Sequence, residues 1–188
     1  RVMWLLEELG EAYEITPAMP QSEEVRAVNP SGKVPVLVDG DLVVTESVGI
    51  CTYLADKHGK FTFPAGTPER AMQDSYTQFA VDVLEGALWT AAKNSFILPE
   101  DIRVPEIKKV CKIEFADGLD LLGKRIGEGP YAMGETFTVA DIILGHCAGW
   151  AISAKFDLPK EGPVYDYFKR LRERPAFQAM MAKVNEAA

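Results

Sequence analysis

The residues of this chain that are suited to chemistry lie close together, between Lys33 and Ser47. Pro35 opens a β-branched run directly after Val34. A proline at the start of a strand marks an edge or an opening, because it cannot donate to a sheet ladder. Glu46 and Ser47 close the run where a helical pattern begins. Free backbone N–H groups and the helix dipole at such a helix end attract an anion.

These groups together suit a small acidic peptide. If the Val34 main chain faces outward at Pro35, it can pair with an extended peptide laid alongside it. That orientation requires a cis Val34–Pro35 bond, the less common isomer. Ser47 can donate its hydroxyl to a carboxylate and Glu46 can pair with an amine, so an amino-acid end satisfies both. Lys33 adds a cation nearby.

The residues alone leave simpler interpretations open. A trans Pro35 can open an ordinary edge strand. Glu46 and Ser47, with Thr45, can serve only to cap the helix that follows them. Lys33 can be a solvated loop cation. Each feature is weak by itself, and only the combination favours a binding site.

A hairpin and a helix must position these residues. The runs Val36–Val38 and Leu42–Thr45 flank Asp39-Gly40, a strong hairpin signal. From Glu46 to His58 the period is helical, with Ile50, Cys51, Leu54 and Ala55 on one face. Three weaker elements come earlier in the chain: a helix over Val2–Leu9 stopped by Gly10, an extended piece around Tyr13–Ile15, and a short helix over Ser22–Val28.

The remainder of the chain predicts helices. Residues 59–68 contain glycines and prolines without periodicity and indicate a linker between domains. Helices are predicted over 69–93, 104–127, 138–153, 163–173 and 175–186. Thr138 and Asp141 form a capping pair with Phe137 and Ile142 at staple positions, and such a cap typically contributes ~1 kcal/mol. Asp141 is therefore predicted to serve folding rather than catalysis.

Composition excludes several classes of protein. The chain of 188 residues is 47% hydrophobic and 26% charged, which is typical of a globular protein. Its net charge of −8 argues against binding to nucleic acid. No apolar run reaches the ~18–20 residues that span a bilayer, and no leader is visible, so we expect a soluble protein. Three widely spaced cysteines and two histidines predict neither disulfides nor a metal site, and favour a reducing cytosol.

The segment N-P-S-G-K-V-P-V-L-V-D-G-D-L-V-V-T-E-S, residues 29–47, resembles the glutathione-binding segment of bacterial-type cytosolic glutathione transferases. The downstream F-T-V-A-D-I resembles the helix-capping motif of that family, and W-L-L-E-E-L-G matches its first helix. The resemblance implies an α+β, thioredoxin-like domain over 1–58, with a mixed sheet and helices. A linker over 59–68 and an all-α helical-bundle domain over 69–188 would follow, in a cytoplasmic homodimer.

The resemblance also implies roles for the residues named above. Pro35 is expected to be cis, and the Val34 main chain to pair with the cysteinyl part of glutathione. Glu46 and Ser47 match the pair that holds the γ-glutamyl end, and Lys33 matches a position near the tripeptide backbone. Glutathione would be the co-substrate, with no metal.

The implied reaction joins the glutathione thiolate to a hydrophobic electrophile. In the family a tyrosine, serine or cysteine near the start of the first helix ionises the thiol. We expect that residue, and the first strand of the sheet, ahead of Arg1, so the catalytic residue is unknown. Cys51 is no substitute, because it lies on the core face of its helix. The alternatives are a glutathione-dependent isomerase, peroxidase or lyase of the same fold, or a non-catalytic binding protein.

Two further expectations concern the helical part. Tyr76, Phe79 and Val83 form an i, i+3, i+7 stripe that can line a second-substrate site, although such stripes also form ordinary core. Asp74 or Asp82 can reach a glutamyl amine across a dimer interface. The electrophile itself is not predicted.

Overall fold

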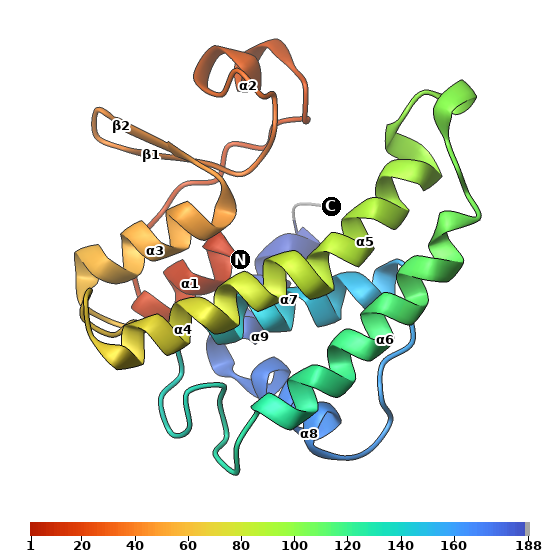
Figure 1. Ribbon diagram of the computed structural model, residues 1–188. Helices are drawn as coiled ribbons and strands as arrows, with labels where there is room; N and C mark the ends of the chain where they lie inside the picture. Colours follow the sequence, from red (N-terminus) through yellow and green to blue (C-terminus); the bar gives the residue numbers. More distant parts are fainter. Residues whose placement is uncertain (187–188) are drawn as a thin grey trace.

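A computed structural model describes residues 1–186 of the chain (Figure 1). Its first part contains α1 (Val2–Leu9), α2 (Glu23–Val28), β1 (Val36–Asp39), β2 (Leu42–Thr45) and α3 (Ser47–His58). The hairpin and α2 stand above α1 and α3, which contact one another. Gly10 and Gly59 end α1 and α3 in the left-handed conformation, which glycine adopts without steric cost. These bounds confirm the predicted helices and hairpin.

The hairpin is antiparallel and pairs Val36 with Thr45 and Asp39 with Leu42. Gly40 takes a φ of 61° in the connecting loop. Asp39 accepts a hydrogen bond from the Tyr53 hydroxyl at 2.9 Å and pairs with Lys57, so α3 holds the tip of the hairpin. The register places Pro35 and Glu46 next to each other at the open end of the pair.

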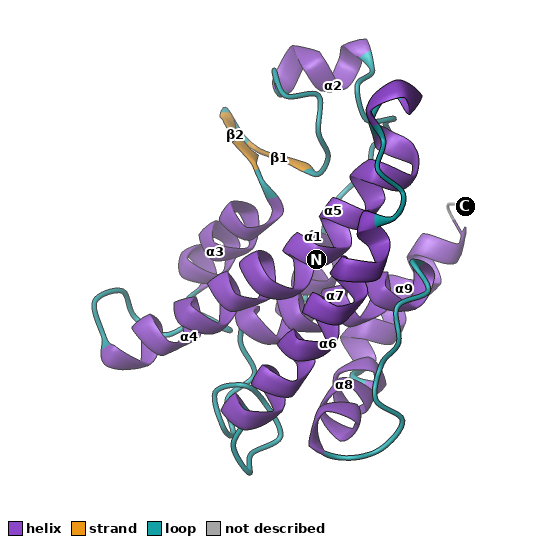
Figure 2. Cartoon of the chain, turned by 45° about the vertical axis from the view of Figure 1, so that its right-hand side comes forward, coloured by secondary structure: helices purple, strands orange, loops and turns teal. Residues whose placement is uncertain are grey.

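The predicted fold class, an α+β part followed by an all-helical part, is confirmed, and the extended piece around Tyr13–Ile15 pairs with no strand in the part of the chain that the structure describes. Within residues 1–186 the sheet contains only β1 and β2, and it is antiparallel rather than mixed (Figure 2). Tyr13 instead donates its hydroxyl to Glu7 at 2.5 Å, with Lys183 over its ring. An extended segment becomes a strand only when a neighbour completes its ladder, and neither hairpin strand pairs with this one.

A long rod of helix opens the second part. It begins as α4 (Pro68–Phe79), continues through the π-helical η1 (Ala80–Glu85) and α5 (Gly86–Ala92), and ends in the π-helical η2 (Lys93–Ile97). The observed rod is therefore longer than the helix predicted over 69–93, and it is π-helical rather than α-helical in η1 and η2. A π turn holds more residues than an α turn and often marks a functional site.

The remaining helices complete the bundle. They are the short 3₁₀ turn η3 (Glu100–Ile102), α6 (Ile107–Arg125), α7 (Val139–Ser153), α8 (Pro163–Glu173) and α9 (Pro175–Glu186). Helix α6 is shorter than the predicted 104–127, whereas α8 and α9 have the predicted bounds. No helix among residues 1–186 is both long enough and apolar enough to cross a bilayer.

Helix α7 lies at the centre of the bundle and contacts α1, α3, α4, α5 and α8. Its first turns, residues 139–145, are buried on all sides, whereas His146, Gly149 and Ile152 further along are exposed. The Trp4 ring from α1 lies against Gly145, where an added Cβ would come within 2.9 Å of the ring. Trp4 also packs edge-on against Phe177 of α9. The hydrophobic core is thus continuous from the first part to the second.

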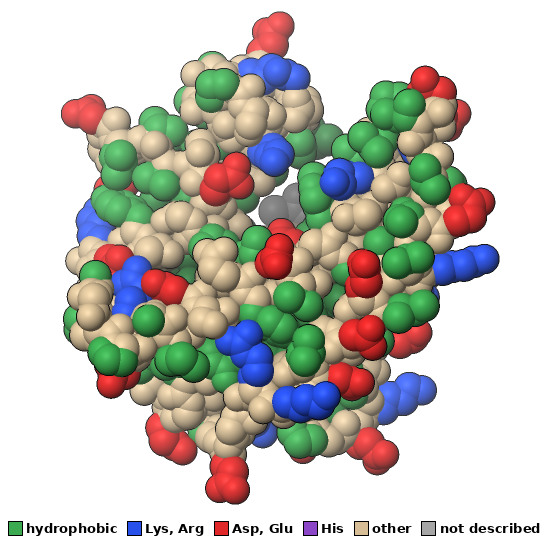
Figure 3. Space-filling model, viewed as in Figure 1, with side chains coloured by type: hydrophobic (Ala, Val, Ile, Leu, Met, Phe, Trp, Pro, Cys, Tyr) green, Lys and Arg blue, Asp and Glu red, His purple; other side chains and the backbone are tan. Residues whose placement is uncertain are grey.

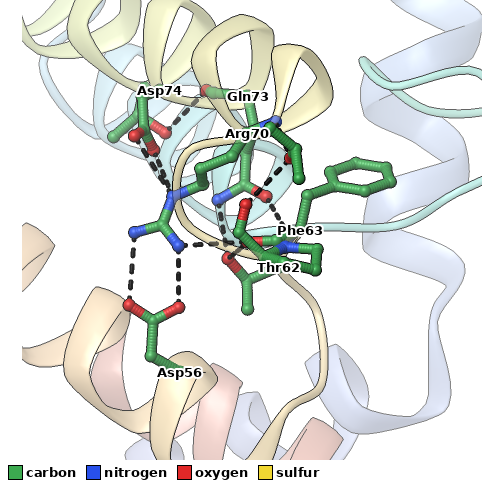
Figure 4. Close-up of polar contacts among 9 residues, drawn as sticks. Asp56, Thr62, Phe63, Arg70, Gln73 and Asp74 are labelled. Carbon is green, nitrogen blue, oxygen red and sulfur yellow. Dashed lines mark hydrogen bonds and ion pairs between the residues drawn. The ribbon is translucent and has the colours of Figure 1, made fainter.

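The segment between α3 and α4 is fastened on both sides (Figure 4). Arg70, only 9% exposed, donates to Asp56 at 2.7 Å, to the Phe63 carbonyl at 3.2 Å and to Asp74 at 3.0 Å. Gln73 accepts from the Phe63 amide at 3.1 Å. The division into domains at 59–68 stays a prediction, because the core and these contacts run across it.

Candidate functional site

A cleft of about 430 Å³ separates the base of the hairpin from the helical rod. In the space-filling view the molecule is hollowed between the α2–hairpin part and the end of α5 (Figure 3). One wall is formed by Arg1, Lys33, Val34, Pro35, Glu46 and Ser47. The opposite wall is formed by Val81, Glu85, Gly86, Trp89, His146 and Trp150. The five binding residues predicted from the sequence therefore share one wall.

The loop that leads into β1 is held by Asn29. Its side chain is buried and donates to the Lys33 carbonyl at 2.9 Å, while its Oδ1 accepts from the Ser31 amide at 3.1 Å. Gly32 has a φ of 66°, and its carbonyl accepts from the Gln21 amide at 2.7 Å. These bonds present Lys33 and Val34 to the cleft.

Val34 carries the main-chain groups available to a guest. Its side chain is 44% exposed, and the Val34–Pro35 peptide bond is cis. Among the hydrogen bonds within residues 1–186, none involves the Val34 amide or carbonyl. An extended peptide lying in the cleft can pair with both groups.

The start of α3 forms the rest of this wall. Glu46 is exposed and has a φ of 64° and a ψ of 116°, a conformation that is costly for a residue with a side chain. The amide of Ile50 bonds the Glu46 carbonyl at 2.9 Å, whereas the amides of the first three helical residues precede the intrahelical ladder. Those donors and the helix dipole make the Ser47 end suitable for a carboxylate.

Arg1 bridges the two walls. Its guanidinium donates to the Ser47 Oγ at 2.9 Å and to a Glu85 carboxylate oxygen at 2.6 Å. The Arg1 side chain is 7% exposed and that of Glu85 22%. Glu85 belongs to η1, so this ion pair joins the rod to the start of α3 across the cleft.

The opposite wall is largely aromatic. Trp89 and Trp150 meet edge to face at 6.1 Å between ring centroids, and the His146 ring lies 6.3 Å from that of Trp150. The imidazole is open to the cleft, but protein atoms crowd its other side, and this desolvation lowers the pKa of His146. The ring is therefore neutral near pH 7 and adds to a weakly polar surface.

The second-substrate stripe predicted from the sequence does not line this cleft. Tyr76 and Phe79 are 5% and 8% exposed and belong to the core, against which Val83 also packs. The Tyr76 hydroxyl donates to the carbonyl of Arg125, the last residue of α6, at 2.5 Å. These three side chains therefore pack as ordinary core, which was the alternative interpretation of the stripe.

Sequence reasoning missed the residues that do form the second wall. Val81, Glu85 and Trp89 recur at a spacing of four, which was the available signal. His146, which the sequence assigned to no site, also faces the cleft.

Other groups with chemical potential lie away from the cleft. Cys51 is fully buried, and burial raises the pKa of its thiol to about 11. It is thus a core residue, as its helix face predicted. Among residues 1–186, His, Cys, Asp and Glu side chains form no group of three that could hold a metal ion.

The predicted capping pair is confirmed at the start of α7. The buried Asp141 carboxylate accepts from the Thr138 amide and the Ala132 amide, each at 2.8 Å, and from the Tyr167 hydroxyl at 2.8 Å. Burial raises the pKa of the Asp141 carboxyl, while these hydrogen bonds act in the opposite direction. The Asp141 carboxylate thus connects three segments of the bundle through hydrogen bonds, and it does not line the cleft.

The fold and the cleft define a class: a small α+β unit that offers a free main-chain edge and an open helix end, docked on a helical bundle. Comparison with known proteins agrees. The N-terminal domain of glutathione S-transferases matches residues 1–75, and the C-terminal domain of the same proteins matches residues 89–179. The chain belongs to the glutathione S-transferase family.

Individual relatives share limited sequence with the chain. A probable glutathione S-transferase of Oryza sativa is 32% identical, over 79% of this chain and 73% of that protein. Glutathione S-transferase F14 of Arabidopsis thaliana is also 32% identical, over 61% of this chain and about half, 47%, of its own length.

A solved structure of similar fold covers the whole chain. The glutathione transferase URE2P6 of Phanerochaete chrysosporium, in complex with oxidized glutathione, superposes with a TM-score of 0.85. It is 28% identical and covers 100% of this chain and 91% of its own. This similarity confirms the predicted fold class.

Proposed function

We propose that the protein is a glutathione transferase that joins the sulfur of glutathione to a hydrophobic electrophile. The observation that carries the proposal is the arrangement of the cleft. Its peptide-binding wall contains all five predicted residues, and its other wall contains Val81, Trp89 and Trp150. A polar wall for one substrate facing an apolar wall for another suits a reaction that joins the two.

In this proposal each part of the tripeptide has a partner. The γ-glutamyl carboxylate is held by the Ser47 hydroxyl and the free amides at the start of α3, and the γ-glutamyl amine by Glu46. The Val34 amide and carbonyl pair with the cysteinyl main chain, as in strand addition. Lys33 lies near the tripeptide backbone. The oxidized glutathione bound to the URE2P6 neighbour supports a ligand of this class.

The reaction requires an ionised thiol, because the thiolate is the nucleophile. A carbon–sulfur bond forms while the bond to the leaving group breaks, and the leaving group departs with the bonding electrons. The thiol proton passes to water. The resemblance assigns the hydroxyl or thiol side chain that favours the thiolate to a residue ahead of Arg1, which stays a prediction.

The second substrate is proposed to lie against Val81, Trp89 and Trp150, and no longer against Tyr76, Phe79 and Val83. An apolar electrophile on this wall would exclude water from the sulfur, and desolvation strengthens a thiolate as a nucleophile. A cytoplasmic homodimer remains part of the proposal. Of Asp74 and Asp82, we favour Asp82 for the proposed contact across a dimer interface, because Asp74 already pairs with Arg70.

The proposal is tested by binding and turnover in the same preparation. Isothermal titration of the full protein with glutathione should give saturable binding, and Trp89 and Trp150 should report it through their fluorescence. Glutathione with chlorodinitrobenzene should then yield the thioether and chloride. Binding without turnover of any electrophile would favour the non-catalytic alternative, and absence of binding would overturn the proposal.

A further inference from the structure

His146 brings an unpaired polar side chain to the aromatic wall of the cleft. It belongs to α7 and is an exposed residue in the lining of the cleft. Among residues 1–186, neither of its ring nitrogens takes part in a hydrogen bond. Glu85, the other ionisable group of this wall, is already held by Arg1. The imidazole is therefore available to a ligand.

The rings beside His146 can donate hydrogen bonds but cannot accept them. Trp89 and Trp150 each carry one indole N–H, and an indole has no acceptor nitrogen. The ring centroids of His146 and Trp150 lie 6.3 Å apart, and those of Trp150 and Trp89 lie 6.1 Å apart. The three rings thus form an apolar surface that contains N–H groups. A ligand that complements this surface is flat and carries a hydrogen-bond acceptor.

His146 is suited to donate a hydrogen bond and is poorly suited to act as a base. Burial on its protein side lowers the pKa of the imidazole to about 3, and the charge of nearby Arg1 acts in the same direction. A neutral imidazole keeps one N–H to donate, and this one takes up a proton only weakly. A neutral imidazole in an enzyme site can polarise a carbonyl oxygen through its N–H.

We propose that His146 is a specificity-determining residue that donates a hydrogen bond to an oxygen of the electrophile. The class of substrate that this contact favours is a flat aryl ketone or aldehyde with a double bond conjugated to its carbonyl. The aryl ring of such an electrophile would lie against Trp89 and Trp150, and its oxygen would meet the imidazole N–H. This inference rests on the proposed function and specifies which electrophiles the cleft prefers.

The reaction with this class is an addition without a leaving group. The sulfur of the glutathione thiolate bonds to the β-carbon, and the electrons of the double bond move to the carbonyl oxygen. The hydrogen bond from His146 stabilises the enolate oxygen that results, and the imidazole keeps its own proton. Water then protonates the α-carbon and the carbonyl forms again. The hydroxide released neutralises the proton that the thiol gave to water.

The first test compares two electrophiles that share a phenyl ring, on the full protein. Benzalacetone carries the conjugated carbonyl, whereas benzyl chloride contains no oxygen. His146→Phe keeps an aromatic ring without a donor, so it should lower kcat for benzalacetone at least ~10-fold and for benzyl chloride less than ~3-fold. His146→Gln keeps an N–H donor and should recover part of the benzalacetone rate. The control His58→Gln, at the end of α3 and outside the cleft lining, should change neither rate.

A binding measurement decides the donor contact even if the protein turns over no electrophile, a result that would overturn the proposed function. Benzylacetone is the saturated ketone, and butylbenzene has a similar frame without oxygen. By tryptophan fluorescence, His146→Phe should bind benzylacetone several-fold more weakly and butylbenzene unchanged. Circular dichroism checks that each variant folds. Equal losses for the two electrophiles, no recovery in His146→Gln, or full affinity for benzylacetone in His146→Phe would each overturn the inference.

Discussion

Two helix starts in this molecule use similar residues for opposite purposes. At the start of α3, Glu46 is exposed, strained in its backbone and open to the cleft. At the start of α7, Thr138 and Asp141 are fully buried, and the Asp141 carboxylate is surrounded by donors. The first helix end keeps its donors free, and the second satisfies them internally.

The two helix starts differ in what they contribute: the start of α7 stabilises the fold, and the start of α3 is left available for binding. A buried carboxylate with several donors cannot be removed without leaving unpaired polar groups, so α7 depends on Asp141. The open start of α3 has water as an alternative partner for its free amides, and the Ser47 side chain makes one hydrogen bond among the described residues, with Arg1. Changes at Glu46 and Ser47 should therefore cost folding less than a change at Asp141. If this comparison is right, substitutions at the two sites should affect different measurements.

The largest effect is expected from Asp141→Ala. The change leaves the Ala132 and Thr138 amides and the Tyr167 hydroxyl without their acceptor, and orphaned buried groups cost ~1–3 kcal/mol each. We expect the free energy of unfolding in urea to fall by about 4 kcal/mol. The folded fraction should keep its affinity for glutathione. Asp120→Ala, on exposed α6 surface, is the control and should change stability by less than ~0.5 kcal/mol.

Tyr167→Phe tests one bond of the same cluster. It removes the hydroxyl that donates to Asp141 at 2.8 Å and preserves the ring. Hydrogen bonds to charged groups contribute ~1.5–3 kcal/mol, so unfolding should become easier by about 2 kcal/mol. Tyr165→Phe on the same helix is the matched control, because that side chain is 39% exposed. Similar losses in both variants would contradict the role given to the Asp141 cluster.

Ser47→Ala tests the open helix end. Loss of one hydrogen bond to a carboxylate should weaken glutathione binding about tenfold, which corresponds to ~1.4 kcal/mol. The free energy of unfolding should fall by ~1–2 kcal/mol, less than in Asp141→Ala, because the variant also loses the hydrogen bond that Ser47 accepts from Arg1 at 2.9 Å. Isothermal titration measures the first quantity and urea unfolding the second, with Ser153→Ala, at the exposed end of α7, as the control. Unchanged affinity would remove Ser47 from the binding site.

The smallest effect, and the most specific, concerns Glu46. Glycine accepts a φ of 64° at this position, so Glu46→Gly should stabilise the fold by about 1 kcal/mol while it weakens glutathione binding. Glu46→Ala keeps the strain and should weaken binding without that gain in stability. Thermal unfolding and isothermal titration distinguish the two variants. An equal gain for alanine would show that the backbone strain lies elsewhere.

Local signals in the sequence predicted one wall of the cleft well. Asp39-Gly40 predicted the hairpin, Gly10 and Gly59 ended their helices as expected, and Glu46-Ser47 marked the start of α3. Such signals depend on backbone chemistry within a few residues. The same is true of the Thr138–Asp141 cap, whose two members lie within one turn.

The other wall could not be predicted in the same way. Two stripes at helical spacing compete on the rod: Tyr76, Phe79 and Val83 pack into the core, whereas Val81, Glu85 and Trp89 face the cleft. Which stripe is covered depends on α6 and α7, which contact η1 from distant parts of the chain. The extended piece near Tyr13 stays outside the sheet for a related reason, since a strand needs a partner.

The sequence by itself determined the hairpin, most helix bounds, the internal cap of α7 and the residues that line the peptide side of the cleft. Each of these depends on short-range rules of turns, caps and periodicity. Only the tertiary structure decided that Glu85, Trp89, His146 and Trp150 face those residues. That outcome depends on how helices far apart in the chain pack together, which no local pattern encodes.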